Sequence, residues 1–316
     1  MKKKQLGKTE LYTTPIVFGG NVFGWTADEK ESFKLMDQFL DMGFNMIDTA
    51  DVYSRWAKGN SGGESERIIG DYMKKRGNRD KIILATKVGS SMQEGGDKDI
   101  SRTHIMKAIE DSLQRLKTDY VDLYFTHWDD DKTPVEETLE AYKRLIEQGK
   151  VRYIGASNLS PERLQASLDA SKKENLPKYE VFQPEYSLAE RNKFEGEIQD
   201  ICIENDLGVI SYFSLASGFL TGKYSSNEDI KGTDREKFLK NYFDDNGENI
   251  LKALKDISDH HNISQAGIAL RWIMQKPGIT APIASASKTE HLKSFQEAID
   301  IELSSEEMDK LDQASS

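Results

Sequence analysis

Residues Gly43 to Tyr53 read Gly-Phe-Asn-Met-Ile-Asp-Thr-Ala-Asp-Val-Tyr. The mostly apolar run Phe44–Ile47 predicts a short buried strand, which ends abruptly in Asp48. Parallel α/β sheets carry their functional side chains where strands end and loops begin. Taken alone, Asp48 is equally compatible with a cap on the next turn and Tyr53 with ordinary packing, so the rest of the chain has to decide.

Composition limits the class of protein. The chain has 316 residues, of which 37% are hydrophobic and 31% charged, enough for a core and a well-solvated surface. A net charge of −11 argues against nucleic acid or an anionic membrane as a partner. The one cysteine, Cys202, permits no intrachain disulfide and suits a reducing cytosol. No signal peptide and no membrane-spanning run is found, so we expect a cytoplasmic protein.

Strand and helix patterns alternate along the whole chain. The predicted strands are Ile16–Gly19, Phe44–Ile47, Lys81–Lys87, Val121–Phe125, Val151–Gly155, Val181–Gln183, Val209–Tyr212 and Thr280–Ala284. A β-hairpin (Lys3–Gln5 with Leu11–Thr13) precedes them, and a polar C-terminal tail with a short helix follows. Eight strand–helix units without a linker predict a single-domain α/β fold over residues 1–316, a (β/α)8 TIM barrel. A doubly wound sheet is the alternative, but no Gly-x-Gly-x-x-Gly follows the first strand.

In such a barrel, residues that follow the strands share one mouth. Asp48, Lys87 and His127 come at the ends of three successive strands, and Tyr53 lies in the loop after the second. A lysine ammonium is expected to lower the pKa of a phenol from about 10, and a carboxylate keeps that lysine charged. A histidine can orient a carbonyl oxygen beside the phenol. The set therefore predicts proton delivery to a carbonyl oxygen whose carbon gains a hydride.

Other chemistries find less support. No Gly-x-Ser-x-Gly nucleophile elbow is present. The adjacent pair His260-His261 falls in a predicted helix and is expected to face two directions, so no metal centre is predicted.

At this point the chain resembles the aldo-keto reductases over essentially its whole length. The motifs that carry the resemblance are Gly43–Tyr53, Gly63–Glu66 with Ile69-Gly70, Ala85–Lys87, Asp119–Tyr124 leading to His127, Gly149–Gly155 with Ser157-Asn158, Gln183–Ser187 and Gly218–Tyr224. The resemblance implies a catalytic tetrad of Asp48, Tyr53, Lys87 and His127. It also implies NADPH bound across the barrel mouth.

By the same resemblance, Ser157, Asn158 and Gln183 would hold the nicotinamide carboxamide, and Tyr212 would stack on the ring. The pyrophosphate would follow Phe213–Gly218, a segment that includes Leu215, Ser217 and Gly218. This sequence departs from the family there, because Tyr212-Phe213-Ser214-Leu215 replaces the usual Tyr-Ser-Pro-Leu.

The adenosine end departs further from the family pattern. The residues expected there are Ser285, Ser287, Lys288 and His291, with Ser294-Phe295 where relatives carry Glu-Asn. Lys288 can meet a 2′-phosphate, and the helix start at Thr289 offers N–H groups. NADPH is therefore expected, with NAD as the alternative.

Aromatic residues in the loops after strands 1, 2 and 4 predict a substrate pocket suited to a partly apolar aldehyde or ketone. They are Phe23, Trp25, Trp56 and Trp128, although Trp56 is also compatible with packing onto its own loop. The polar segment 221–247 is compatible with a lid over the mouth or with a disordered insertion.

Two rival functions stay open. The potassium-channel β subunits share the fold and keep the tetrad and the cofactor, which predicts a regulatory or assembly protein. An unrelated barrel enzyme, such as an aldolase or a sugar-phosphate isomerase, would need a Schiff-base lysine or an enolate base and a phosphate site.

Overall fold

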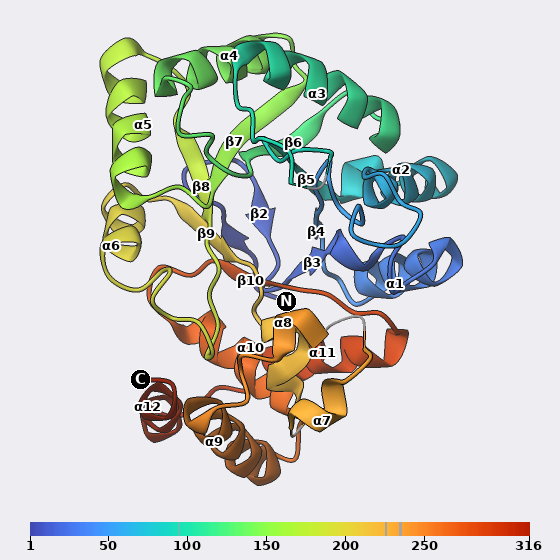
Figure 1. The fold of residues 1–316 in the computed structure, drawn as a ribbon, viewed down its shortest axis with the longest axis vertical. Helices are drawn as coiled ribbons and strands as arrows, with labels where there is room; N and C mark the ends of the chain where they lie inside the picture. The colour runs from blue at the N-terminus through green and yellow to red at the C-terminus, as the bar shows by residue number, and fades with distance from the viewer. Residues whose placement is uncertain (94, 225, 234–235) are drawn as a thin grey trace.

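The core of the protein is a closed barrel of parallel strands in the computed structural model, which describes residues 1–93, 95–224, 226–233 and 236–316 (Figure 1). The strands follow one another in chain order, and β10 closes the barrel by pairing with β3. This confirms the predicted (β/α)8 architecture. The barrel strands are β3 (Val17–Gly19), β4 (Met46–Asp48), β5 (Ile83–Val88), β6 (Val121–Thr126), β7 (Val151–Ser157), β8 (Tyr179–Gln183), β9 (Gly208–Ser211) and β10 (Ala281–Ala284).

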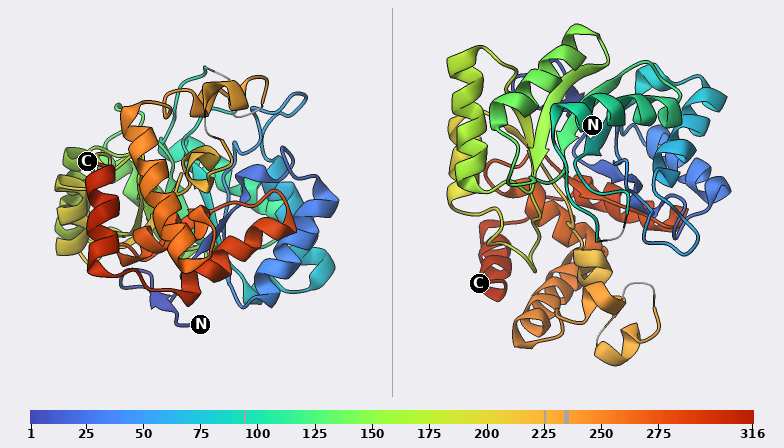
Figure 2. Two further views of the ribbon diagram at one scale, coloured as in Figure 1. Left: turned by 90° about the horizontal axis from the view of Figure 1, so that it is seen from below. Right: turned by 45° about the horizontal axis from the view of Figure 1, so that its top comes forward.

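Helices surround the barrel and cover its outer face (Figures 1 and 2). Their buried apolar faces and the outward strand residues form the larger part of the core. Side chains cap several helix starts: Asp28 caps α1 and Ser101 caps α3, each accepting a backbone N–H. The helices of the ring are α1 (Glu29–Asp41), α2 (Glu64–Arg76), α3 (Arg102–Leu116), α4 (Val135–Glu147), α5 (Pro161–Glu174), α6 (Glu197–Glu204), α9 (Asp245–His261), α10 (Gln265–Gln275), α11 (Lys293–Asp300) and α12 (Ser305–Ala314). Among the described helices, none has the length and apolar character that crossing a bilayer requires.

The predicted N-terminal hairpin plugs one end of the barrel. Strands β1 (Lys4–Gln5) and β2 (Tyr12–Thr13) pair antiparallel, and Leu6 and Leu11 between them are buried in the inner core. Gly7 lies at a φ of +56°, so close to the start of β8 that a Cβ would meet Glu180 O at 2.3 Å. The hairpin therefore closes the amino-terminal end of the strands and leaves the carboxyl end available for a site.

The segment that follows β9 is ordered in its described part. It contains the turn η3 (Ala216–Thr221) and two one-turn helices, α7 (Asn227–Ile230) and α8 (Glu236–Leu239). Ile230 and Leu239 are buried, and Tyr242 stacks on Phe219 of η3 with ring centroids 5.3 Å apart. In the left view of Figure 2 these orange helices lie at the top and the N-terminal hairpin at the bottom, so they occupy the opposite end of the barrel. Residues 225, 234 and 235 of the predicted lid lie outside the described residues.

The ends of the elements differ from prediction by a few residues. Asp48, predicted to follow its strand, is the last residue of β4, and Lys87 lies within β5. Helix α9 begins at Asp245 because Asp244 accepts the N–H of Gly247 as its cap. These shifts leave the polar side chains inside the barrel wall at its carboxyl end.

Candidate active site

Lys87 is the centre of the candidate site. Its side chain is fully buried, and Nζ donates to Asp48 Oδ2 at 2.6 Å, to Thr49 O at 2.8 Å and to Tyr53 Oη at 2.9 Å. An ammonium group has three hydrogens, so these three acceptors satisfy it completely. Burial lowers the pKa of Lys87, whereas the Asp48 carboxylate acts in the opposite direction.

Asp48 anchors this arrangement from the end of β4. Its carboxylate is 1% exposed, and the oxygen that does not face Lys87 accepts a hydrogen bond from Gln183 Nε2 at 3.0 Å. A buried charge is stable only when it is paired and hydrogen-bonded, and both conditions are met here. The role expected for Asp48 as a partner of the lysine, rather than a helix cap, agrees with this geometry.

Tyr53 lies half-buried in the loop after β4, with its hydroxyl on the lysine and its ring 6.0 Å from the ring of His127. Burial raises its pKa well above the usual value, and the Asp48 carboxylate raises it further. The lowering expected from the Lys87 ammonium does not prevent this net rise. Desolvation of the phenolate and the nearby carboxylate outweigh the ammonium, so the phenol holds its proton at neutral pH.

His127 follows β6 directly and is fixed by its backbone N–H, which donates to Val88 O at 2.8 Å. Burial lowers its pKa well below the usual value and Lys87 adds to the effect, so the imidazole is neutral. Its Nδ1 lies 3.1 Å from Ser90 Oγ. A hydroxyl that donates to Nδ1 leaves the ring hydrogen on Nε2. Ser90 was missed at the sequence level, although it stands only three residues beyond Lys87.

The residues expected to hold a nicotinamide form one hydrogen-bonded network at the ends of β7, β8 and β9. Ser157 Oγ donates to Gln183 O at 2.8 Å, and Asn158 Nδ2 donates to His127 O at 2.9 Å. Tyr212 Oη donates to Asn158 Oδ1 at 2.7 Å. The structure therefore joins these four residues to the tetrad, through Gln183 to Asp48 and through Asn158 to His127.

The segment expected to follow the pyrophosphate has an unusual backbone. Phe213, Ala216, Ser217 and Gly218 all have positive φ values, from 45° to 103°, and the Phe213 ring is 40% exposed. Leu215 lies between them at φ −109° and ψ 17°, and the N–H groups of Ala216 and Gly218 close tight turns onto Phe213 O and Leu215 O. Strained backbone of this kind is concentrated at functional sites.

The residues expected at the adenosine end lie along the loop after β10. Ser285 Oγ lies 2.8 Å from Gly19 O and 2.6 Å from Asn21 Oδ1 and shares its one hydrogen between these acceptors, so it ties this loop to β3. Ser287 is half-buried, and His291 is exposed on the short helix η4 (Thr289–Leu292). Lys288 is exposed and lies 3.8 Å from Glu290, a weak surface pair that an incoming phosphate can displace.

Three of the four predicted pocket aromatics lie near the tetrad or at the surface beside it. The Trp56 ring packs 5.9 Å from that of Tyr53 and 5.7 Å from that of Trp25, and Trp128 is 6.2 Å from His127. Phe23 requires a correction: it is fully buried and stacks on Phe18 at 5.2 Å. It supports the loop after β3 from the core and lines no open surface.

The chain is similar to known proteins over nearly its whole length. Residues 15–316 match the model of the aldo/keto reductase family. The chain is 33% identical to the uncharacterized oxidoreductase YrpG of Bacillus subtilis, covering 97% of this chain and 93% of the relative. It is 34% identical to the aldo-keto reductase YhdN of the same organism, with 92% and 84% covered.

A third relative carries a different description. The chain is 31% identical to a probable voltage-gated potassium channel subunit beta of Arabidopsis thaliana, with 95% of this chain and 92% of the relative covered. The family match spans nearly the whole chain, and the fold agrees with it. The protein therefore belongs to the aldo/keto reductase family, whose members use a nicotinamide cofactor and act on small carbonyl compounds, and it is an oxidoreductase.

Proposed function

We propose that this protein reduces aldehydes or ketones to alcohols with NADPH, and that Tyr53 is the general acid. The observation that carries the proposal is the 2.9 Å contact between Lys87 Nζ and Tyr53 Oη, with Asp48 on the far side of the lysine. When bound, the nicotinamide cofactor supplies a hydride to the carbonyl carbon.

The protein's own residues then manage the proton. A neutral His127 with hydrogen on Nε2 donates to the carbonyl oxygen and orients it beside Tyr53. The raised pKa of Tyr53 keeps the phenol protonated, as an acid must be before it acts. As the proton passes to the substrate, the developing phenolate is stabilised by Lys87, whose position Asp48 and Thr49 O maintain.

The residues present fit the cofactor. Ser157, Asn158 and Gln183 offer amide and hydroxyl groups for a carboxamide, and the half-buried Tyr212 offers a ring beside them. The ordered segment packed on η3 lies at the same end of the barrel, which supports its role as a cover for the cofactor.

Tyr53→Phe tests the role of the phenol. General acid catalysis contributes about 10²- to 10⁴-fold, so carbonyl reduction should fall by that factor while NADPH binding survives. Absorbance at the nicotinamide band measures turnover, and fluorescence quenching measures NADPH affinity. Tyr12→Phe, which removes an exposed hydroxyl in the hairpin, is the matched control. If Tyr53→Phe reduces a generic aldehyde as fast as the unaltered protein does, Tyr53 is not the general acid.

Lys288→Met tests the preference for NADPH. Loss of the one lysine placed by the resemblance at a 2′-phosphate should raise the KM for NADPH about tenfold, equivalent to about 1.4 kcal/mol, and leave the KM for NADH unchanged. Lys255→Met removes another exposed lysine that is paired with an acid, Asp259, and should change neither value. If Lys288→Met changes the KM for NADPH and the KM for NADH by the same factor, Lys288 does not contact the 2′-phosphate.

A regulatory or assembly function is the second candidate, because two relatives are described as probable potassium channel β subunits at 31% and 32% identity. Such a role predicts slow turnover with every carbonyl tested, a cofactor that stays bound through purification, and a stable partner. Rapid turnover with exchangeable cofactor favours the enzyme.

An aldolase is less compatible with the site. A Schiff base needs a free, uncharged amine, whereas all three hydrogens of Lys87 are engaged and Asp48 holds it as a cation. Borohydride should therefore trap no carbonyl compound on Lys87.

A further inference from the structure

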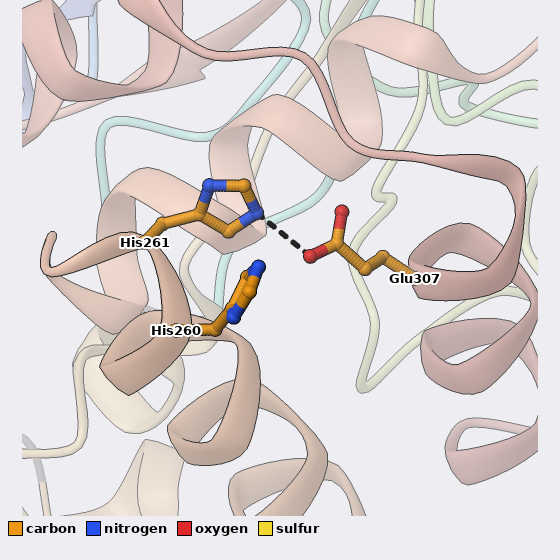
Figure 3. Close-up of side chains that lie close together, drawn as sticks. All are labelled: His260, His261 and Glu307. Carbon is orange, nitrogen blue, oxygen red and sulfur yellow. Dashed lines mark hydrogen bonds and ion pairs between the residues drawn. The ribbon is translucent and has the colours of Figure 1, made fainter.

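His260 and His261, at the end of α9, lie close together, contrary to the prediction that they face two directions. Their ring centroids lie 5.0 Å from each other, and Glu307 of α12 faces them (Figure 3). One ligand atom from each of these three side chains lies within 4.8 Å of the other two. The expectation of a poor chelate considered one helix alone, whereas the third group comes from a neighbouring helix.

This donor set suits a transition metal. Two imidazole nitrogens and a carboxylate oxygen are typical ligands of Zn²⁺, Co²⁺ and Ni²⁺. Metal–ligand bonds of about 2.0–2.1 Å place the donors of a tetrahedral site about 3.3 Å apart. His261 Nε2 and Glu307 Oε1 are already 2.7 Å apart, so they need to separate only slightly. His260 is exposed, which leaves its side chain room to rotate inward.

The surroundings prepare the site for a cation. Glu307 Oε2 accepts the backbone N–H of Ser304 at 2.9 Å in the capping box of α12, which leaves Oε1 directed at His261. A hydrogen bond to the other oxygen of a carboxylate orients that carboxylate before a metal ion binds. Both histidines lie in the last turn of α9, where the helix dipole is negative and favours positive charge.

We propose that His260, His261 and Glu307 bind a divalent transition-metal ion, Zn²⁺ or an ion of its class, with water completing the coordination. The ion takes the place of the hydrogen shared by His261 and Glu307, and His261 keeps its ring hydrogen on Nδ1. Because the ligands come from α9 and α12, the metal crosslinks the C-terminal helix α12 to α9. The site shares no residue with the tetrad and is independent of the reductase function.

The test is calorimetric titration of the EDTA-treated full chain with ZnCl₂, together with the visible absorption of a Co²⁺ complex. We expect one site in the unaltered protein and a rise in its thermal midpoint. His261→Ala and Glu307→Gln should each weaken Zn²⁺ binding at least about tenfold. Glu307→Gln is the sharper variant, because glutamine preserves the capping box and hence α12.

His104→Ala is the matched control, since it removes another histidine, half-buried, that lies 4.0 Å from an acid, Asp99. It should bind Zn²⁺ as the unaltered chain does. Circular dichroism of each variant separates loss of a ligand from loss of fold. The proposal fails if the unaltered chain does not bind Zn²⁺. It also fails if the folded variants Glu307→Gln and His261→Ala bind Zn²⁺ as tightly as the unaltered chain does, or if His104→Ala weakens Zn²⁺ binding as much as those two variants do.

Discussion

At the scale of single residues, the tetrad shows how burial sets the protonation of a site. Desolvation disfavours every charged form, so it raises the pKa of Tyr53 and lowers those of Lys87 and His127. Only Lys87 has an ion-pair partner that opposes the effect. The result is a protonated phenol, a charged lysine and a neutral imidazole, which is the combination that proton donation to a carbonyl oxygen requires.

Ser90 is predicted to position His127. Ser90→Ala removes the donor to Nδ1 and lets the imidazole carry its hydrogen on either nitrogen. A neutral hydrogen bond is worth about 0.5–1.5 kcal/mol, so kcat/KM for a carbonyl should fall about 2- to 10-fold. NADPH affinity should not change, and Ser90→Thr should recover the rate because it keeps the hydroxyl.

The neighbouring variant Ser91→Ala is the control for this prediction. Ser91 Oγ accepts a hydrogen bond from Gln93 N, so its loss affects the same loop without touching His127. If Ser91→Ala lowers kcat/KM as much as Ser90→Ala does, the effect comes from the loop and not from the imidazole.

At the scale of elements, the segment after η3 is attached to the barrel mainly by its own aromatic residues. The ring of Phe219 in η3 stacks on the ring of Tyr242 and packs edge-on against that of Phe243. The centroid distance is 5.3 Å in each pair. The polar sequence of 221–247 indicated neither helix nor packing, because its buried residues are few and widely spaced. Ile230 and Leu239 are nevertheless buried, and α8 packs against η3.

Tyr242→Ala tests whether this segment covers the cofactor. An aromatic pair contributes about 0.5–1.5 kcal/mol beyond its buried area, so loosening it should speed NADPH release about 2- to 10-fold. Stopped-flow fluorescence measures the release rate. Phe238→Ala, which shortens a 38% exposed ring on α8, should leave it unchanged. Identical release rates in all three proteins would show that the segment does not cover the cofactor.

At the scale of the whole molecule, His127 is predicted to couple stability to pH. Its pKa is near 6.5 in the unfolded chain and well below that in the folded protein. Below about pH 6.5 the unfolded state therefore binds a proton that the folded state does not, so stability falls as the pH drops toward 5. Urea unfolding at several pH values measures the slope.

His127→Asn should flatten that slope, because asparagine does not titrate. If His127→Asn loses stability with falling pH just as steeply, other groups cause the dependence.

The sequence by itself determined the alternation of strand and helix, and therefore the barrel. It also determined that Asp48, Lys87 and His127 lie together at the carboxyl end of the barrel strands. These features depend on apolar periodicity and chain order, which are local and visible in one dimension. The family of the protein follows from the same residues.

Only the tertiary structure decided which groups touch. The Ser90–His127 contact, the burial of Phe23, the raised pKa of Tyr53 and the approach of Glu307 to the two histidines all depend on packing between segments distant in the chain. Desolvation and hydrogen bonding act over a few ångströms in space, and spacing along the sequence does not reveal those distances.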